Sequence, residues 1–269
     1  MALTALALAA VAGLATPPAT AVVNRVSVPP PAPVVAPADT VDDLRDVFAV
    51  DALLSNLNGD PWPDAVAARL VLAPDAGTAE IAAAANVAAR LGYETTATDL
   101  GRAATLGGTF DAPVVLIGDG PAASSGLDVA ALRAGMAPGQ GAVVHVGPSA
   151  AYRRGGLALV GYDASGLLEA SAYLAGRHPS VWDVDGTSWS EVVEGVDSLA
   201  AGAAGAELRR IVVDGRRPGV ARARVRVRVP DATAREALLG RLAAPAPDSG
   251  AHPLADLHVR DLHRMDVLV

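Results

Sequence analysis

Oxygen-bearing side chains occupy alternate positions in the stretch "NLNGDPWPD", residues 56–64. They are Asn56, Asn58, Asp60 and Asp64. Calcium takes about 6–8 hard oxygen ligands, and alternate spacing in a tight loop brings such oxygens to one side of a turn. The stretch therefore predicts a calcium loop, in which calcium would be the only cofactor of the chain.

Three features of this loop depart from the usual calcium pattern. Its first ligand is Asn56, the third ligand is followed by Pro61, and Ala67 stands where a bidentate Glu is usual. Two carboxylates would give a weak site, and a bound ion would stiffen the entry to the folded domain. The alternative is a polar turn that leads into the first strand.

A second group of polar residues lies in "GDGPAASSG", residues 118–126, between an apolar run and a helical pattern. Open α/β sheets bind ligands at such turns, so Asp119, Ser124 and Ser125 are candidate ligand-binding residues. A serine hydroxyl here could bind a small anion at the helix N-terminus. Ala123 replaces a glycine of the dinucleotide pattern and the chain has no Lys, so we expect no nucleotide cofactor. The alternative is a surface turn.

Three further candidates lie later in the chain, one at the end of a predicted strand and two after a predicted helix. Asp163 precedes a helical pattern, and Trp182 and Asp183 lie in "VWDVDG". An indole next to a carboxylate suits a sugar ring, and Asp183 with Asp185 could form the carboxylate pair of a glycosidase. The alternative is an aspartate-rich turn. The chain has no Cys and no G-x-S-x-G elbow, which excludes thiol catalysis and that serine arrangement.

Alternate arginines, Arg222, Arg224, Arg226 and Arg228, occupy one face of a predicted strand. Such a stripe could bind phosphate or a polyanion, or it could be a solvent face paired with acids such as Asp214 or Asp256. The net charge of −8 argues against nucleic acid and anionic membranes as partners.

The elements that must position these residues are visible as apolar runs and helical periods. Buried strands are predicted at residues 69–74, 93–99, 113–119, 141–147 and 156–163. Helices are predicted at residues 41–50, 78–92, 126–135 and 164–177. Alternation of strands and helices predicts an α/β domain over residues 41–195, with a mostly parallel sheet and flanking helices.

The last part of the chain has a different pattern. Strands at residues 207–215 and 220–230 precede a helix at residues 231–244 and a terminal strand-like run. This order predicts a small α+β domain over residues 205–269, with an antiparallel sheet of its own.

The N-terminus carries export signals. Residues 1–21 are rich in Ala and Leu and end in an A-x-A pattern, which predicts a signal peptide. The run is too short for a stable membrane span. Residues 22–40 are rich in proline and predict an extended linker. We therefore expect a secreted, periplasmic or cell-envelope protein. Its alanine-rich composition and 3% aromatic residues predict a core of small aliphatic side chains.

Part of the chain contains the runs "PVVLIGDG", "MAPGQGAVVHV" and "GLALVGYDASGLLEASAYLAGRHPSVWD". With these runs it resembles the non-catalytic Rossmann-like or flavodoxin-like modules of carbohydrate-processing systems. Examples are the N-terminal domain of alpha-glucuronidases and the periplasmic regulatory subunit of cellulose synthase. The shared "G-x-D-x-x-G" turn is Gly161, Asp163 and Gly166 here. The resemblance covers residues 69–183 and implies an accessory role without catalytic residues.

The function that these observations favour is an exported, non-catalytic binding or scaffolding module of a carbohydrate-related or envelope system. Its partner would be a polysaccharide or an envelope protein. One alternative is a hydrolase that acts on a glycan or another envelope polymer. A further alternative is the non-catalytic front end of a longer hydrolase.

Overall fold

Strand β5 (Val114–Ile117) lies inside the parallel part of the sheet, and every one of its residues is buried. It pairs in parallel with β3 (Arg69–Leu72) on one side and with β7 (Gly156–Gly161) on the other. Strand β4 (Ala103–Thr105) continues the parallel arrangement beyond β3. Runs of Val, Leu and Ile without polar positions are typical of strands that are covered on both faces.

The computed structural model describes residues 41, 43–60, 62–96, 102–176, 188–200, 205–216, 221–243, 256–259 and 264–268. All of them belong to one compact unit, Val35–Val269. The predicted signal peptide and linker, residues 1–40, lie outside the described residues, and both stay predictions.

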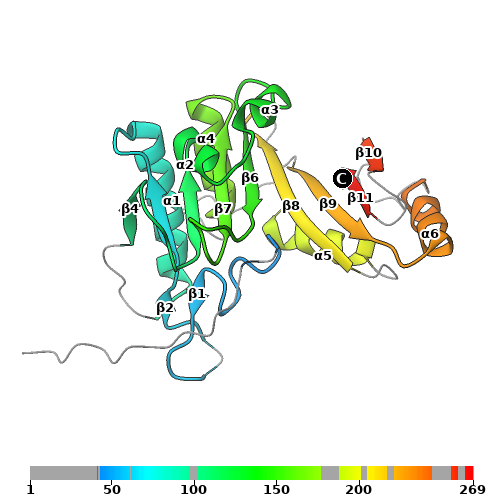
Figure 1. Cartoon of the computed structure of the whole chain (residues 1–269), viewed down its shortest axis with the longest axis horizontal. Helices are drawn as coiled ribbons and strands as arrows, with labels where there is room; N and C mark the ends of the chain where they lie inside the picture. The colour runs from blue at the N-terminus through cyan, green and yellow to red at the C-terminus, as the bar shows by residue number, and fades with distance from the viewer. Residues whose placement is uncertain are drawn as a thin grey trace, which may run out of the picture. The chain divides into compact units, whose positions relative to one another are not determined.

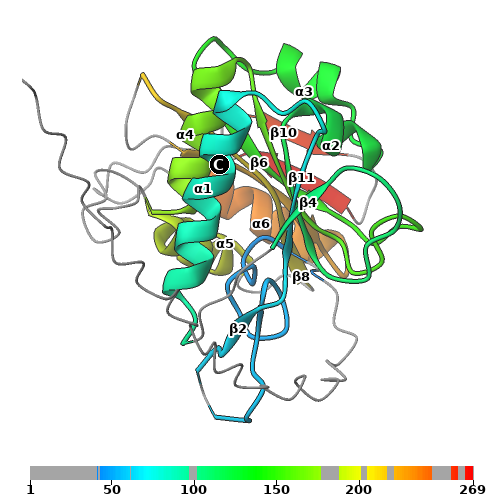
Figure 2. The same ribbon diagram turned by 90° about the vertical axis from the view of Figure 1, so that its left-hand side faces the viewer.

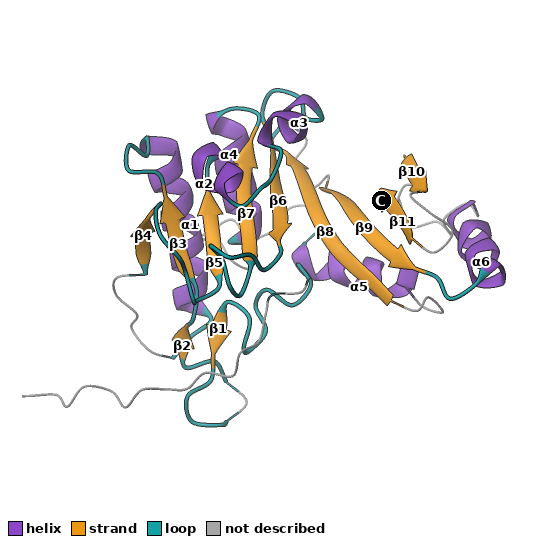
Figure 3. Ribbon diagram, in the orientation of Figure 1, coloured by secondary structure: helices purple, strands orange, loops and turns teal. Residues whose placement is uncertain are grey.

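The other half of the sheet is antiparallel. Strand β6 (Gln140–Val146) pairs with β7 and with β8 (Gly205–Asp214), and β9 (Ala221–Arg228) pairs with β8. Strands β11 (Arg264–Leu268) and β10 (Asp256–Val259) follow. The sheet has nine strands in the order β10-β11-β9-β8-β6-β7-β5-β3-β4 (Figures 1 and 3).

This order confirms an α/β fold in which β4, β3, β5 and β7 are parallel and helices flank the sheet. It does not confirm a separate small domain over residues 205–269. Strand β8 hydrogen-bonds along β6, so the C-terminal strands extend the first sheet and do not form a sheet of their own. The antiparallel character predicted for these strands is confirmed.

Helices cover both faces of the sheet (Figure 2). Helices α1 (Thr78–Tyr93), α4 (Ala164–Leu174) and α5 (Trp189–Ala200) lie on one face. Helices α2 (Asp119–Ser124) and α3 (Val129–Ala134) lie on the other. Helix α6 (Ala232–Ala243) follows β9. Among the described residues, no helix is both long enough and apolar enough to cross a membrane.

Each face of the sheet has its own apolar core. On the first face, Val87 of α1 and Leu174 of α4 pack in one cluster with strand residues such as Ile117. On the second face, Ala122 of α2 packs in another cluster with Leu116. Successive residues of a strand point to opposite faces of the sheet, so Leu116 and Ile117 of β5 pack in different cores.

Helix α1 confirms the helix predicted at residues 78–92, and a side-chain hydrogen bond stabilises its N-terminus. Gly77 precedes the helix, and the Glu80 carboxylate accepts a hydrogen bond from the Gly77 backbone N–H at 2.5 Å. The strand predicted at residues 93–99 is wrong over its described part, residues 93–96, because Tyr93 still belongs to α1 and no strand begins before residue 97; residues 97–99 lie outside the described residues, and β4 begins at Ala103. The next parallel strand therefore lies farther along the chain than its β-branched residues indicated.

The helix predicted at residues 41–50 is also wrong. Its described residues form turns, although Val41, Leu44 and Val47 are buried at helical spacing. Hydrogen bonds to β8 hold this segment in place: the Leu44 N–H donates to the Leu208 carbonyl at 3.1 Å. Beyond it, β1 (Leu54–Ser55) and β2 (Ala65–Val66) form a separate two-stranded sheet that flanks the predicted calcium loop.

The "G-x-D-x-x-G" turn joins β7 to α4 at very close range. A Cβ on Gly166 would lie 2.0 Å from the Gln140 carbonyl oxygen, and one on Gly161 would lie 2.3 Å from the Asp163 carbonyl oxygen. Real Cβ atoms do not come this near to a backbone oxygen. Both glycines therefore allow α4 to pack directly on β6 and β7.

Candidate functional site

The sequence placed the candidate residues Asp119 and Asp163 at the ends of two predicted strands, and the structure shows that these strands are parallel neighbours. Asp119 begins α2 directly after β5, and Asp163 precedes α4 directly after β7. Arg133 of α3 joins the two turns, because it forms an ion pair with Asp119 and donates to the Gly161 carbonyl at 3.4 Å. Arg133 thus links α3 both to the start of α2 and to the end of β7.

Asp163 caps α4. Its Oδ1 accepts hydrogen bonds from the Gly166 N–H at 2.9 Å and the Ser165 hydroxyl at 2.7 Å, and its Oδ2 accepts from the Gly139 N–H at 3.0 Å. The Ser165 hydrogen bond, followed by that from Gly166, lowers the pKa of Asp163. The carboxylate is therefore kept charged at the helix N-terminus, where a negative charge is favourable.

The two serines of the predicted anion site bond to their own helix. Ser124 Oγ donates to the Pro121 carbonyl at 2.5 Å and lies 2.5 Å from the Tyr152 hydroxyl, while Ser125 Oγ donates to the Ala122 carbonyl at 2.7 Å. Their role as ligand-binding residues stays a prediction. Trp182 and Asp183 lie outside the described residues.

The predicted calcium loop is closed by side-chain oxygens. Asp64 Oδ2 accepts from the Leu57 N–H at 2.7 Å, and Asn56 Oδ1 accepts from the Gly59 N–H at 2.7 Å. The Asn58 amide nitrogen lies 3.0 Å from Asp60 Oδ2 and 3.2 Å from Asp64 Oδ1. Side chains of all four residues therefore hydrogen-bond within this loop, and calcium binding there stays a prediction.

A pocket that the sequence did not indicate lies beside α5. It has a volume of ≈ 570 Å³ and is lined by the rings of Phe48, Tyr173 and Trp189. The ring centroids of Phe48 and Trp189 are 6.2 Å apart, and those of Tyr173 and Trp189 are 5.9 Å apart. Three distant segments thus build one aromatic wall.

Among the described residues, equal numbers of arginines and glutamates line this pocket. They are Arg45, Arg90, Glu94 and Glu194. Arg90 and Glu94 form an ion pair at 2.5 Å across one turn of α1, and the Arg90 guanidinium lies 4.6 Å from the centroid of the Phe48 ring. The pocket therefore combines apolar ring faces with paired polar groups, as small-molecule sites commonly do.

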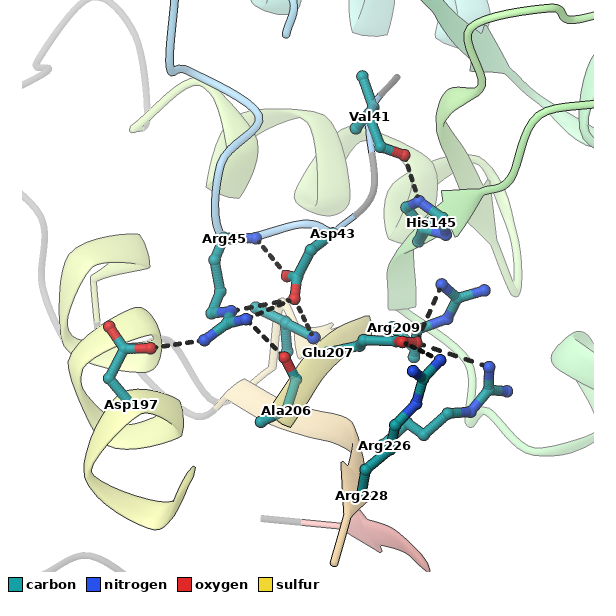
Figure 4. Close-up of polar contacts among 11 residues, drawn as sticks. Val41, Asp43, Arg45, His145, Asp197, Ala206, Glu207, Arg209, Arg226 and Arg228 are labelled. Carbon is teal, nitrogen blue, oxygen red and sulfur yellow. Dashed lines mark hydrogen bonds and ion pairs between the residues drawn. The ribbon is translucent and has the colours of Figure 1, made fainter. Parts of the chain in front are cut away.

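A polar network fixes Arg45 at the pocket (Figure 4). Asp43 Oδ2 accepts from Arg45 Nε at 3.0 Å, and Asp197 Oδ1 lies 2.6 Å from Arg45 Nη1. Arg45 Nη2 donates to the Ala206 carbonyl at 2.5 Å. Burial by itself lowers the pKa of Arg45, but the hydrogen bonds and charges of Asp43 and Asp197 raise it overall, so this residue stays cationic.

Two donors in the pocket have no acceptor among the described residues. They are the indole N–H of Trp189 and Nε of Arg90, both without solvent access. A buried donor without a partner is costly, so a ligand that accepts hydrogen bonds would be favoured here. Aromatic residues make up only 3% of the chain, and this scarcity was the sequence signal that could have drawn attention to Phe48, Tyr173 and Trp189.

The described segments that end at Gly176 and begin again at Ser188 both line the pocket. Among the described residues, no group of three or more His, Cys, Asp or Glu side chains is arranged to hold a metal ion. Compared with protein-family models, curated proteins and solved structures, the chain shows no match to any of them.

Proposed function

We propose that this chain is an exported, non-catalytic binding module of a carbohydrate-related or envelope system, and that its ligand is a saccharide bound in the pocket beside α5. The observation that carries the proposal is the aromatic wall. Of the two Phe, three Trp and four Tyr residues in the chain, Phe48, Trp189 and Tyr173 line one pocket.

The chemistry of the lining supports a sugar. Ring faces pack against the C–H faces of a sugar ring, while charged side chains hydrogen-bond its hydroxyl groups. The unpartnered indole N–H of Trp189 would donate to a hydroxyl oxygen. Among the described residues, two arginines and two glutamates line the pocket, so the described lining carries no net formal charge, which favours a neutral polar ligand over an ion.

The pocket also supports the alternative of a glycan hydrolase, because Glu94 and Glu194 both line it. Two carboxylates beside a sugar are the minimum that glycoside hydrolysis needs. We favour binding because Glu94 is already paired with Arg90, which leaves Glu194 as the carboxylate open to a second role. The remaining alternative is the front end of a longer hydrolase, in which this pocket would hold substrate for a catalytic domain.

The test is a glycan array followed by calorimetry on the best saccharide. We expect Trp189→Ala to weaken binding by at least about tenfold, since stacking and a hydrogen bond are lost together. The matched control is Trp62→Ala, because Trp62 is 67% exposed on the 56–64 loop and does not line the pocket. Equal losses in both variants, or an array without any bound saccharide, would contradict the proposal.

Turnover distinguishes the two classes. The proposal predicts no release of reducing sugar from the bound saccharide over many hours. Release that is abolished in Glu194→Gln, with binding retained, would establish the hydrolase instead. Tyr173→Phe, which removes one hydroxyl only, tests the binding mode with little risk to folding.

Export is proposed from the N-terminal sequence. Residues 1–21 fused to a reporter should carry it out of the cytoplasm, with cleavage after Ala21. A reporter that stays inside the cell would remove this part of the proposal and leave the saccharide pocket unaffected.

A further inference from the structure

Strands β8 and β9 carry a cluster of arginines on the face that they share with α2 and α3. Arg210 of β8 is the register partner of Arg224 on β9, and Val212 is the partner of Arg222. Val212 and Val144 belong to the core on that same face, and Val144 is the partner of Arg210. The side chains of Arg210, Arg222 and Arg224 therefore lie on this same face of β8 and β9. Figure 1 shows these two strands to the side of α2 and α3.

Like charges opposite each other on paired strands are destabilising. Nearby, Arg226 and Arg228 lie 3.6 Å and 3.2 Å from the Glu207 carboxylate, which compensates their charge (Figure 4). For Arg210, Arg222 and Arg224, the described part of the chain contains no ion pair or hydrogen bond to the guanidinium. The positive charge of this cluster is therefore uncompensated, in a chain whose net charge is −8.

Arg210 is held in an unfavourable environment by its burial and by the two arginines near it. Its Nε is shielded from solvent and has no acceptor among the described residues. Burial, followed by repulsion from Arg224 and Arg222, lowers the pKa of Arg210 to about 10. A buried cation with an unused donor is stabilised by an oxyanion, because guanidinium groups bind carboxylate and phosphate through paired hydrogen bonds.

We infer that this arginine face of β8 and β9 binds a linear anionic polysaccharide through its carboxylate or phosphate groups. Arg222 and Arg224 stand at alternate strand positions, about 6.7 Å apart, which suits a polymer whose charges repeat along its length. The face is separate from the saccharide pocket, because none of these arginines lines that pocket. The inference therefore does not depend on the proposed function.

Other anionic partners fit the face less well. Neither β8 nor β9 contains an aromatic residue, so bases of a single-stranded nucleic acid would have nothing to stack on. Protein interfaces commonly combine arginines with buried aromatic anchors, but β8 and β9 contain no aromatic residue. The apolar residue of this cluster, Val212, is only 7% exposed and offers no anchor either. A flexible charged polymer needs no such anchor.

The test measures binding of the full chain to immobilised polygalacturonate, which carries carboxylates, and to a phosphomannan, which carries phosphates. Dextran is the neutral control. We expect binding to at least one anionic polysaccharide but not to dextran, and weaker binding at higher salt. Arg222→Gln and Arg224→Gln should each raise Kd about tenfold. Arg153→Gln, which removes an exposed arginine that lies in the turn between β6 and β7 and is paired with Asp111, should leave Kd unchanged.

Thermal unfolding accompanies each binding measurement. Arg224→Gln relieves the repulsion of Arg210, so its unfolding midpoint should not fall, and weaker binding cannot then be ascribed to a loss of structure. Three results would overturn the inference: no preference of the wild type for the anionic polysaccharides over dextran, unchanged Kd in both β9 variants, or tighter binding of poly-glutamate or duplex DNA. Which polysaccharide binds more tightly identifies carboxylate or phosphate as the recognised group.

Discussion

Asp43 accepts a hydrogen bond from the backbone N–H of Leu208 at 3.0 Å, although 165 positions separate them in the chain. Strand β8 has an irregularity between Leu208 and Arg210, and β6 pairs with it only from Arg210 onward. The segment that contains Asp43 and Leu44 hydrogen-bonds to β8 where β6 no longer does. A side chain and a short piece of backbone thus join the N-terminal segment to the antiparallel half of the sheet.

This relationship predicts a large loss of stability in Asp43→Ala. The Asp43 side chain is 6% exposed and compensates Arg45, so its removal leaves a half-buried cation and an unpaired backbone N–H. Breaking such a pair costs about 3 kcal/mol. Chemical denaturation measures it. Asp197→Ala is the control: its side chain is 59% exposed, so its loss should cost less than about 1 kcal/mol. Equal costs would show that Asp43 is not the central residue of the network.

His145 predicts a dependence of stability on pH. Its Nε2 lies 2.6 Å from the Val41 carbonyl oxygen, so a neutral imidazole protonated at Nε2 donates a hydrogen bond to that oxygen. Its Nδ1 has no partner among the described residues. Burial is the largest cause that lowers the pKa of His145. The hydrogen bond to Val41 opposes it, Arg209 adds to it, and Asp43 and Glu207 oppose it.

The sign follows from these causes. Above pH 6.5, the ordinary value, His145 is neutral in both states and contributes no pH dependence. Below it, the unfolded chain binds a proton that the folded chain resists, so stability falls as the pH is lowered toward the depressed folded pKa. Denaturation of wild type and His145→Gln between pH 7 and pH 5 should show a smaller loss in the variant. Parallel curves would mean that His145 is not responsible.

Gly166→Ala tests the close contact between α4 and β6. Its Cβ would lie 2.0 Å from the Gln140 carbonyl oxygen, so the helix would have to move and a cost of about 3 kcal/mol is expected. Gly195→Ala in α5 is the matched control, because a Cβ there meets nothing within 4 Å. That variant should gain about 0.5–1 kcal/mol from helix propensity alone. Thermal unfolding of both proteins measures the difference.

The calcium loop predicts a stabilisation by the metal itself. Calcium at about ten times its Kd should stabilise the folded chain by ~1.4 kcal/mol, because only the folded loop brings its oxygens together. The change in unfolding midpoint should disappear in Asp60→Asn/Asp64→Asn and persist in Asp75→Asn, an exposed carboxylate outside the loop. A midpoint that calcium leaves unchanged in the wild type would remove the site.

Several elements were predictable because their signals are local. The helix at residues 78–92 and the strand at residues 113–119 follow from continuous periods of apolar residues, and α1 and β5 confirm them. Asn58, Asp60 and Asp64 are also close in sequence, and their side chains hydrogen-bond to one another, while calcium binding by this loop stays a prediction. The helix predicted at residues 41–50 failed because long-range hydrogen bonds to β8 outweighed a weak local preference.

The amino-acid sequence by itself determined the alternation of strands and helices, the positions of Asp119 and Asp163 at the ends of predicted strands, and the alternate arginines of β9. Only the tertiary structure decided that β8 joins β6 in one sheet, that Phe48, Tyr173 and Trp189 share a pocket, and that Arg210 faces Arg224. The reason is physical: backbone periodicity acts between near neighbours, whereas strand register and side-chain packing depend on segments that the chain brings together only when it folds.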